Sequence, residues 1–379
     1  MAQGRPALLV IDQLDAVSSA SGRHPEFFAT IDELLRQASA HPNLRVLIVC
    51  RGFDLENDAR LRALRQRDQT APEVTVGPLP PETVRETVAA LGLDPNRLVE
   101  GQIRLLALPL HLMLFATVAQ TATEAALSIR TAKDLFDVFW IEKRTRLAER
   151  RIAPAAWDEP LHALAQLMSE QQALSVSRGH LRGHVSAADI DAMVSEHVLV
   201  TDSNRLSFFH EAFFDYVFAR FFVEDGDPVG SWLRGSDQHL FRRAQVRQIL
   251  VYRRDADFFG YLEDLRDLLT GPSVRAHIRQ TVFAVLGAMG QPHLEEWALL
   301  EPLVGVQEPA VQRAARNTLF RSIGWFRLLD RIGVIENWLD GNDEGRRDLA
   351  FSVMRHYADR KPDRVAALLT ARLDRDDFW

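Results

Sequence analysis

The chain has 379 residues, of which 47% are hydrophobic and 26% charged, so it has the composition of a globular protein with room for two or three domains. Its net charge of −7 provides no overall basic field for nucleic acid or anionic lipid. Cys50 is the single cysteine, which excludes an intrachain disulfide and a cysteine-rich metal site. The N-terminus lacks a basic and apolar leader, and the most apolar run, 105–119, is shorter than the ~20 residues of a membrane span. We therefore expect a cytoplasmic protein without a membrane segment.

The first 79 residues have the alternating pattern of an α/β domain. Apolar runs at 8–11 and 44–50 are typical of parallel strands buried on both faces, and Pro25 opens a helical pattern between them. A third β-type run, 74–76, ends before Gly77. Strand, helix and strand in this order predict a right-handed crossover in a parallel sheet. The first and third strands would need neighbours in addition to the strands predicted here.

Residues 80–152 have a helical pattern. A helix is predicted from Pro81 to a stop at Gly92. A second is predicted over 105–118 and is interrupted at Pro109, where the ring removes a backbone donor and favours a kink or a break between two helices. A third is predicted over 134–151.

Residues 153–225 have the element order of a winged-helix domain. A helix over 158–172 is followed by Ser186, a good N-cap for the next helix. Strand, turn and strand are then predicted from 198 to 208. An aromatic helix over 209–222 completes the order, and its Phe and Tyr side chains are expected to form the core.

Residues 237–379 are predicted to be helical throughout, with weak internal similarity. Pro272 and Pro309 each precede an apolar helix and lie 37 residues apart, and 346–357 resembles a third copy. This period favours a HEAT-like stack of helix pairs. The predicted fold class is therefore mainly α, with a partial α/β sheet at the N-terminus.

Two acids follow the first predicted strand. A carboxylate at this position can hold Mg²⁺ through water beside nucleotide phosphates, which makes Asp12 and Asp15 candidate catalytic residues and Asp12 a candidate metal ligand. The alternative is that both acids merely end a strand and cap a loop. Gln13 between them can orient water but cannot accept its proton, so any hydrolysis is expected to be slow.

Three further residues are candidate site residues. Arg51 follows the second strand, at the strand end where α/β sheets bind ligands, although it would also suit a solvated loop. Without a ligand, Pro109 would simply break a helix. His210 would then be a histidine that caps a helix or lies in the core. Cys50 is interpreted as a small core residue rather than a nucleophile.

In this order, the motifs resemble the STAND class of signalling NTPases, in particular its NACHT-type module. Ala107 stands where the family's G-x-P motif has glycine, Asp215 replaces a glutamate, and no Walker A motif G-x-x-x-x-G-K-[ST] occurs in the sequence. The similar segments are Ile11-Asp12-Gln13-Leu14-Asp15 (Walker B), Cys50-Arg51 (sensor 1), Leu108-Pro109-Leu110 (G-x-P in the helical lid) and Phe208-Phe209-His210-Glu211-Ala212-Phe213-Phe214-Asp215-Tyr216 (winged-helix F-x-H-x-x-F-x-E-Y).

The resemblance implies a partial P-loop NTPase core at 1–79, a helical lid at 80–152, a winged helix at 153–225 and sensor repeats at 237–379. Asp12 would hold Mg²⁺ through water, and Arg51, Pro109 and His210 would contact ATP or ADP, with His210 locking the ADP-bound state. A protein partner or ligand sensed by the repeats would release the lock and allow homo-oligomerisation, in antiphage defence or transcriptional control. Without Walker A, we expect a truncated or split product that is inactive as an ATPase on its own.

Two other functions compete with this interpretation. A nucleotide-independent helical-repeat scaffold gains support from the missing Walker A motif. A DNA-binding regulator would use the helix at 186–197 for recognition, but this segment carries Asp189, Asp191 and Glu196 and no Lys or Arg. Because such a helix would repel phosphates, nucleic acid is not an expected partner.

Overall fold

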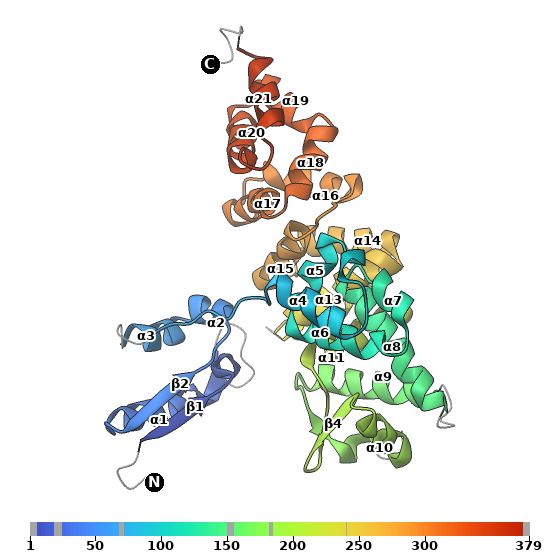
Figure 1. Cartoon of the computed structure of the whole chain (residues 1–379). Helices are drawn as coiled ribbons and strands as arrows, with labels where there is room; N and C mark the ends of the chain where they lie inside the picture. The colour runs from blue at the N-terminus through green and yellow to red at the C-terminus, as the bar shows by residue number, and fades with distance from the viewer. Residues whose placement is uncertain are drawn as a thin grey trace. The chain divides into compact units, whose positions relative to one another are not determined.

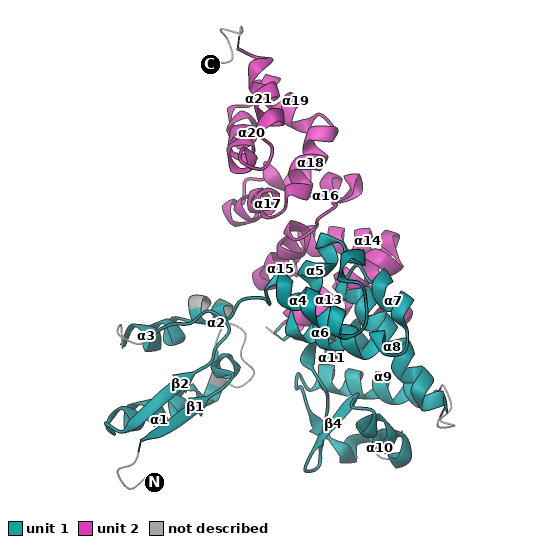
Figure 2. Ribbon diagram, viewed as in Figure 1, with its two compact units in different colours: residues 1–221, 239–241 teal, residues 222–238, 242–379 magenta. Residues whose placement is uncertain are grey.

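The computed structural model describes residues 6–18, 25–67, 72–149, 155–181, 185–239 and 241–373. The described chain is mainly helical, as predicted (Figure 1). It divides into two compact units, residues 1–221 with 239–241 and residues 222–238 with 242–379 (Figure 2).

The N-terminal part of the first unit contains two parallel strands, as predicted. Ala7 pairs with Leu44 at one end of the ladder and Ile11 with Ile48 at the other. A small core of Leu14, Val17 and Leu61 joins the loop after the first strand to the last helix of this segment. The elements are β1 (Ala7–Ile11), α1 (Phe28–Ser39), β2 (Leu44–Ile48), α2 (Gly52–Asn57) and α3 (Ala59–Arg67).

Both strands have the apolar pattern of strands buried on both faces, but several of their apolar side chains are exposed in the described part of the chain. Leu8 is 61% and Val10 52% exposed on β1, and Leu47 is 49% exposed on β2. Parallel strands become buried only where helices or further strands cover both faces, and β1 and β2 pair only with each other in the described part. The sheet therefore presents apolar side chains to solvent.

The third predicted strand, 74–76, is also corrected. Val74 and Val76 are 83% and 93% exposed, in a stretch without regular structure. A β-type run becomes a strand only when a neighbouring edge accepts its backbone groups, and the proline that follows Gly77 cannot donate to a ladder.

Five α-helices follow within residues 72–149. Pro109 occupies the first turn of its helix, where its missing N–H costs nothing. The axes of the helices before and after Leu108 differ by 107°, so the predicted interruption is a break between two helices. The end of the predicted helix 134–151 beyond Glu149 lies outside the described residues. The helices are α4 (Pro81–Ala90), α5 (Glu100–Leu106), α6 (Pro109–Ala119), α7 (Thr123–Ser128) and α8 (Ala132–Glu149).

The next segment has the predicted helices and hairpin together with one strand that was not predicted. Ser186 caps its helix as expected, because its Oγ accepts a hydrogen bond of 3.2 Å from Ala188 N. The strands pair antiparallel in the order β3-β5-β4. The elements are α9 (Ala155–Glu170), β3 (Val176–Ser177), α10 (Ala187–Ser195), β4 (Leu199–Asp202), β5 (Arg205–Phe208) and α11 (Glu211–Glu224).

An aromatic cluster fills the core between α8 and α11, as the aromatic pattern predicted. Phe213 lies at its centre and is fully buried. The Tyr216 hydroxyl donates a hydrogen bond of 2.6 Å to Asp137 Oδ1 on α8, which satisfies the polar end of a buried ring. The cluster comprises Phe136, Phe139, Trp140, Phe208, Phe209, Phe213 and Tyr216.

The second unit is a row of packed helices. One layer forms because α13 packs on α15, α15 on α17 and α17 on α20, while α14, α16 and α19 flank them. Buried hydrogen bonds also hold these helices together: Trp325 Nε1 donates to Leu286 O at 2.9 Å, and Tyr357 Oη donates to Leu319 O at 3.0 Å. The helices are α12 (Val229–Arg234), α13 (Arg242–Ala256), α14 (Phe258–Thr270), α15 (Ala276–Gly287), α16 (Leu294–Val304), α17 (Pro309–Arg321), α18 (Ile323–Arg331), α19 (Val334–Asp340), α20 (Glu344–Tyr357) and α21 (Pro362–Thr370).

Within the described ranges, no helix taken singly has both the length and the apolar character needed to cross a membrane. The bent pair α5 and α6 meets these two criteria only when both helices are counted together.

Candidate functional site

The loop after β1 is tied to the end of β2. Gln13 adopts a left-handed backbone conformation with φ 56°, which turns the chain directly after the strand. Leu14 N then donates to Val49 O at 2.8 Å, and Asp15 Oδ1 accepts from Arg51 N at 3.4 Å. These bonds place Asp15 and Arg51 side by side at the carboxyl end of the sheet.

The Arg51 guanidinium connects this sheet edge to the start of α11. Its Nε lies 3.2 Å from Asp15 Oδ2, and its Nη2 forms an ion pair with Glu211, which lies 160 residues further along the chain. Partial desolvation acts to lower the pKa of Arg51, but the charges of Glu211 and Asp15 outweigh it and raise that pKa. The arginine side chain remains 55% exposed, so it is held by two carboxylates and still reachable from solvent.

His210 immediately precedes α11 and caps it. Its Nδ1 accepts a hydrogen bond of 3.0 Å from Ala212 N, which leaves the proton on Nε2 in the neutral ring. Desolvation lowers the pKa of His210; Glu211 opposes this effect, and the nearby Arg51 and His111 add to it. The imidazole is therefore neutral at pH 7 and offers one N–H donor beside the Arg51–Glu211 pair.

His111 on α6 is a further member of this neighbourhood that the sequence did not reveal. Its Nδ1 donates to Leu105 O at 2.9 Å, and its ring meets Phe136 edge-on with centroids 6.3 Å apart. Desolvation lowers the pKa of His111. Its position two residues after Pro109 in an otherwise apolar helix was the available signal, but a lone histidine in such a helix is usually a core residue.

The structure brings together only some of the predicted site residues. Asp15, Arg51 and His210 meet through Glu211, which the sequence analysis did not single out. Asp12 is exposed at the end of β1, where its Oδ1 accepts from Gln13 N at 2.9 Å, and Pro109 is exposed at the start of α6. Among the described residues, no group of three or more His, Cys, Asp or Glu side chains could hold a metal ion.

Two of these residues, Arg51 and His210, have side chains that can donate hydrogen bonds to a phosphate. Phosphates are commonly held by successive backbone N–H groups of a glycine-rich loop and by a lysine, and the sequence contains no such motif. Arg51 and the Nε2–H of His210 can contact phosphate oxygens, and Asp12 can contribute to a metal shell only through water. Arg51 and His210 are thus two possible phosphate contacts, and the sequence contains no Walker A motif.

Cys50, next to Arg51, is predicted to be unreactive. Burial, reinforced by the negative charge of Asp15, raises the pKa of the thiol to about 11, so only about 0.1% is thiolate at pH 8. We expect alkylation by iodoacetamide at pH 8 to be roughly 100-fold slower in the native protein than in denaturant. Because Cys50 is the single cysteine, mass spectrometry of the whole chain measures the rate directly. Equal rates in the two states would contradict the raised pKa.

Comparison with known proteins adds no assignment. No protein-family model matches the chain, and no curated protein matches it.

Proposed function

We propose that this chain carries the sensing side of a nucleotide-dependent signalling switch of the STAND class with a NACHT-type module. The observation that carries the proposal is the Arg51–Glu211 ion pair beside His210. The pair links two proposed phosphate contacts. Arg51, at the sheet edge, would face the γ-phosphate of ATP, and His210, at the start of α11, would contact ADP. The two motifs meet although they lie 160 residues apart.

The ion pair would work as a two-state contact. In the ADP-bound state, His210 would donate its Nε2–H to the nucleotide while Arg51 would stay paired with Glu211. In the ATP-bound state, Arg51 would exchange Glu211 for phosphate and so free the start of α11. Bound Mg²⁺ would neutralise phosphate charge, with Asp12 orienting its water shell and Asp15 holding Arg51. Each nucleotide shifts the equilibrium only by its different affinity for the two states.

The proposed domains follow the same scheme. Residues 1–79 form the partial NTPase core, 80–152 the lid with Pro109 near the adenine, 153–225 the winged helix, and 237–379 HEAT-like repeats. The β3-β5-β4 sheet with its helices supports the winged helix. The row of helices from α13 to α20 supports the repeats. The repeats would sense a protein or other ligand, and the released form would assemble into a homo-oligomer.

Isothermal titration calorimetry with ATP and ADP in Mg²⁺ tests the proposal. We use residues 1–379 and a version extended upstream through any P-loop encoded there. We expect binding only by the extended form, and a loss of about tenfold or more in Arg51→Ala and His210→Ala, because each removes a charge or donor facing phosphate. Arg97→Ala is the matched control, since this exposed arginine pairs with Glu124 at 2.9 Å and should leave binding unchanged.

The absence of binding by both versions would overturn the nucleotide function. The second candidate, a nucleotide-independent interaction scaffold, would then be favoured. The observation supporting it is the row of packed helices in the second unit, which provides an extended surface without any need for a nucleotide.

A further inference from the structure

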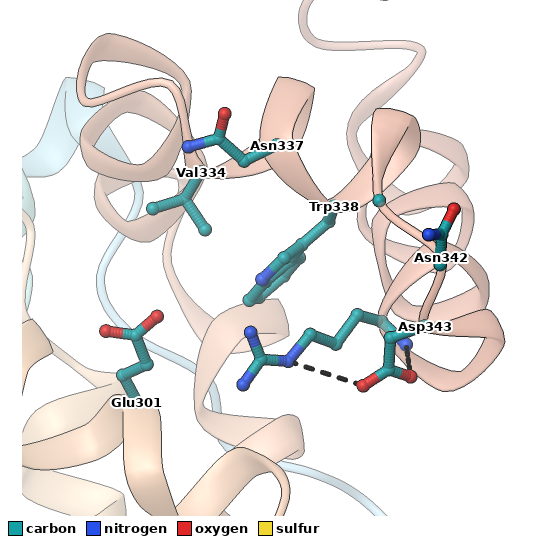
Figure 3. A pocket seen from close by; sticks show the side chains of 8 residues that line it. Glu301, Val334, Asn337, Trp338, Asn342 and Asp343 are labelled. Atoms are coloured by element: carbon teal, nitrogen blue, oxygen red, sulfur yellow. Dashed lines mark hydrogen bonds and ion pairs between the residues drawn. The ribbon is translucent and has the colours of Figure 1, made fainter.

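The second unit contains a cavity of about 330 Å³ between α16, α19 and the start of α20 (Figure 3). Val334 and the Trp338 indole form its apolar wall, and Glu301 faces them from α16. Gly333, with φ 74°, turns the chain into α19 in a conformation that other residues rarely adopt. Trp338 is fixed from behind by Trp297, with ring centroids 5.9 Å apart. The wall is therefore built on packed helices rather than on loops.

The two carboxylates that line the cavity, Asp343 and Glu301, differ in how many hydrogen bonds and ion pairs they form. Asp343 caps α20, because its Oδ1 accepts from Arg346 N at 3.1 Å, and its Oδ2 lies 3.6 Å from Arg346 Nε. Glu301, which is half-buried, forms no ion pair or hydrogen bond with the described residues. After the Asp343–Arg346 pair is formed, the cavity keeps one negative charge beside an aromatic ring.

We propose that this cavity binds a guanidinium or alkylammonium group, presented as the basic side chain of a partner peptide, between Glu301 and Trp338. A carboxylate together with an indole attracts cations by direct charge and by the negative face of the ring. The volume lies at the low end of ligand pockets, about 300–1,000 Å³, and suits one side chain. This site is separate from the nucleotide residues and does not depend on the proposed function.

Arg346 acts as an internal competitor of this ligand. Its guanidinium has the same charge as the ligand and occupies Asp343, the second carboxylate of the cavity. Removal of its charge would leave the Asp343 carboxylate without its ion pair, while the backbone bond that caps α20 would remain. The proposal therefore requires that neutralising Glu301 and neutralising Arg346 change the affinity in opposite directions, which a merely structural role of the two residues would not produce.

Calorimetric titration of the full chain with a blocked Gly-Arg-Gly peptide tests this, with the citrulline peptide as its uncharged counterpart. We expect at least about tenfold weaker binding for citrulline and in Glu301→Gln, and about threefold or greater tightening in Arg346→Gln. Glu295→Gln, on the same helix but outside the cavity, should leave the affinity unchanged. Circular dichroism confirms the fold of each variant.

Equal binding of the arginine and citrulline peptides would overturn the proposal, as would unchanged affinity in Glu301→Gln. The proposal would also be overturned if neither peptide bound to the native chain or to Arg346→Gln.

Discussion

Replacing Phe213 by alanine is expected to destabilise the first unit by about 3–5 kcal/mol, the usual cost of removing a buried phenylalanine from a packed core. The side chain is fully buried. Its ring centroid lies 5.1 Å from that of Phe209 and 5.4 Å from that of Phe139. Because the contacts join α8, the end of β5 and α11, the surrounding side chains cannot all move inward to fill the cavity.

Urea unfolding combined with hydrogen exchange of α8 and α11 measures this effect, because exchange assigns the transition to the correct unit. Phe259→Ala is the control, since this phenylalanine is 76% exposed and should change stability by less than about 0.5 kcal/mol. A loss below about 1 kcal/mol for Phe213→Ala would show that the cluster is loosely packed.

The second large effect is expected at Glu296, a fully buried carboxylate on α16. Its Oε1 lies 2.7 Å from Arg254 Nε and accepts a hydrogen bond of 2.7 Å from the Tyr261 hydroxyl. Its Oε2 accepts a hydrogen bond of 2.7 Å from His293 N. Burial and the Glu296 charge raise the pKa of Tyr261 well above its usual value, so the tyrosine remains a donor at any physiological pH.

Glu296→Ala is therefore expected to cost about 3–5 kcal/mol, because it leaves a partly buried cation and a buried hydroxyl without their acceptor. Glu296→Gln should cost less, since the amide oxygen can still accept from Tyr261. Denaturant unfolding with hydrogen exchange across α13–α16 gives the difference. Glu295→Ala, at the exposed neighbouring position, is the control, and equal stability of Glu295→Ala and Glu296→Ala would contradict the buried network.

Local patterns predicted the elements well where backbone chemistry decides them. Pro109 marked a helix boundary because proline lacks a donor, and Ser186 marked a helix start because its hydroxyl can replace one. The apolar runs before Asp12 and Arg51 gave both paired strands. The prediction of a strand at 74–76 was wrong because a strand also requires a neighbouring strand edge to pair with, which composition does not encode.

The candidate site was predictable only in part, for the same reason. Asp15 and Arg51 were each predicted as site residues after neighbouring parallel strands, whose carboxyl ends share one edge of a sheet, but the contact between them was not predicted. Glu211 was missed because its role arises from a tertiary ion pair with Arg51, and His111 because its effect on His210 depends on the folded arrangement. The cavity at Trp338 was likewise invisible in the sequence, since its walls come from three helices and no local motif marks them.

The row formed by α13, α15, α17 and α20 has a consequence for how this gene can change over time. Each of these helices packs on the next one along the row, so the duplication or deletion of a whole helix pair would leave the remaining interfaces intact. The row therefore tolerates the gain or loss of whole helix pairs more readily than that of part of a pair.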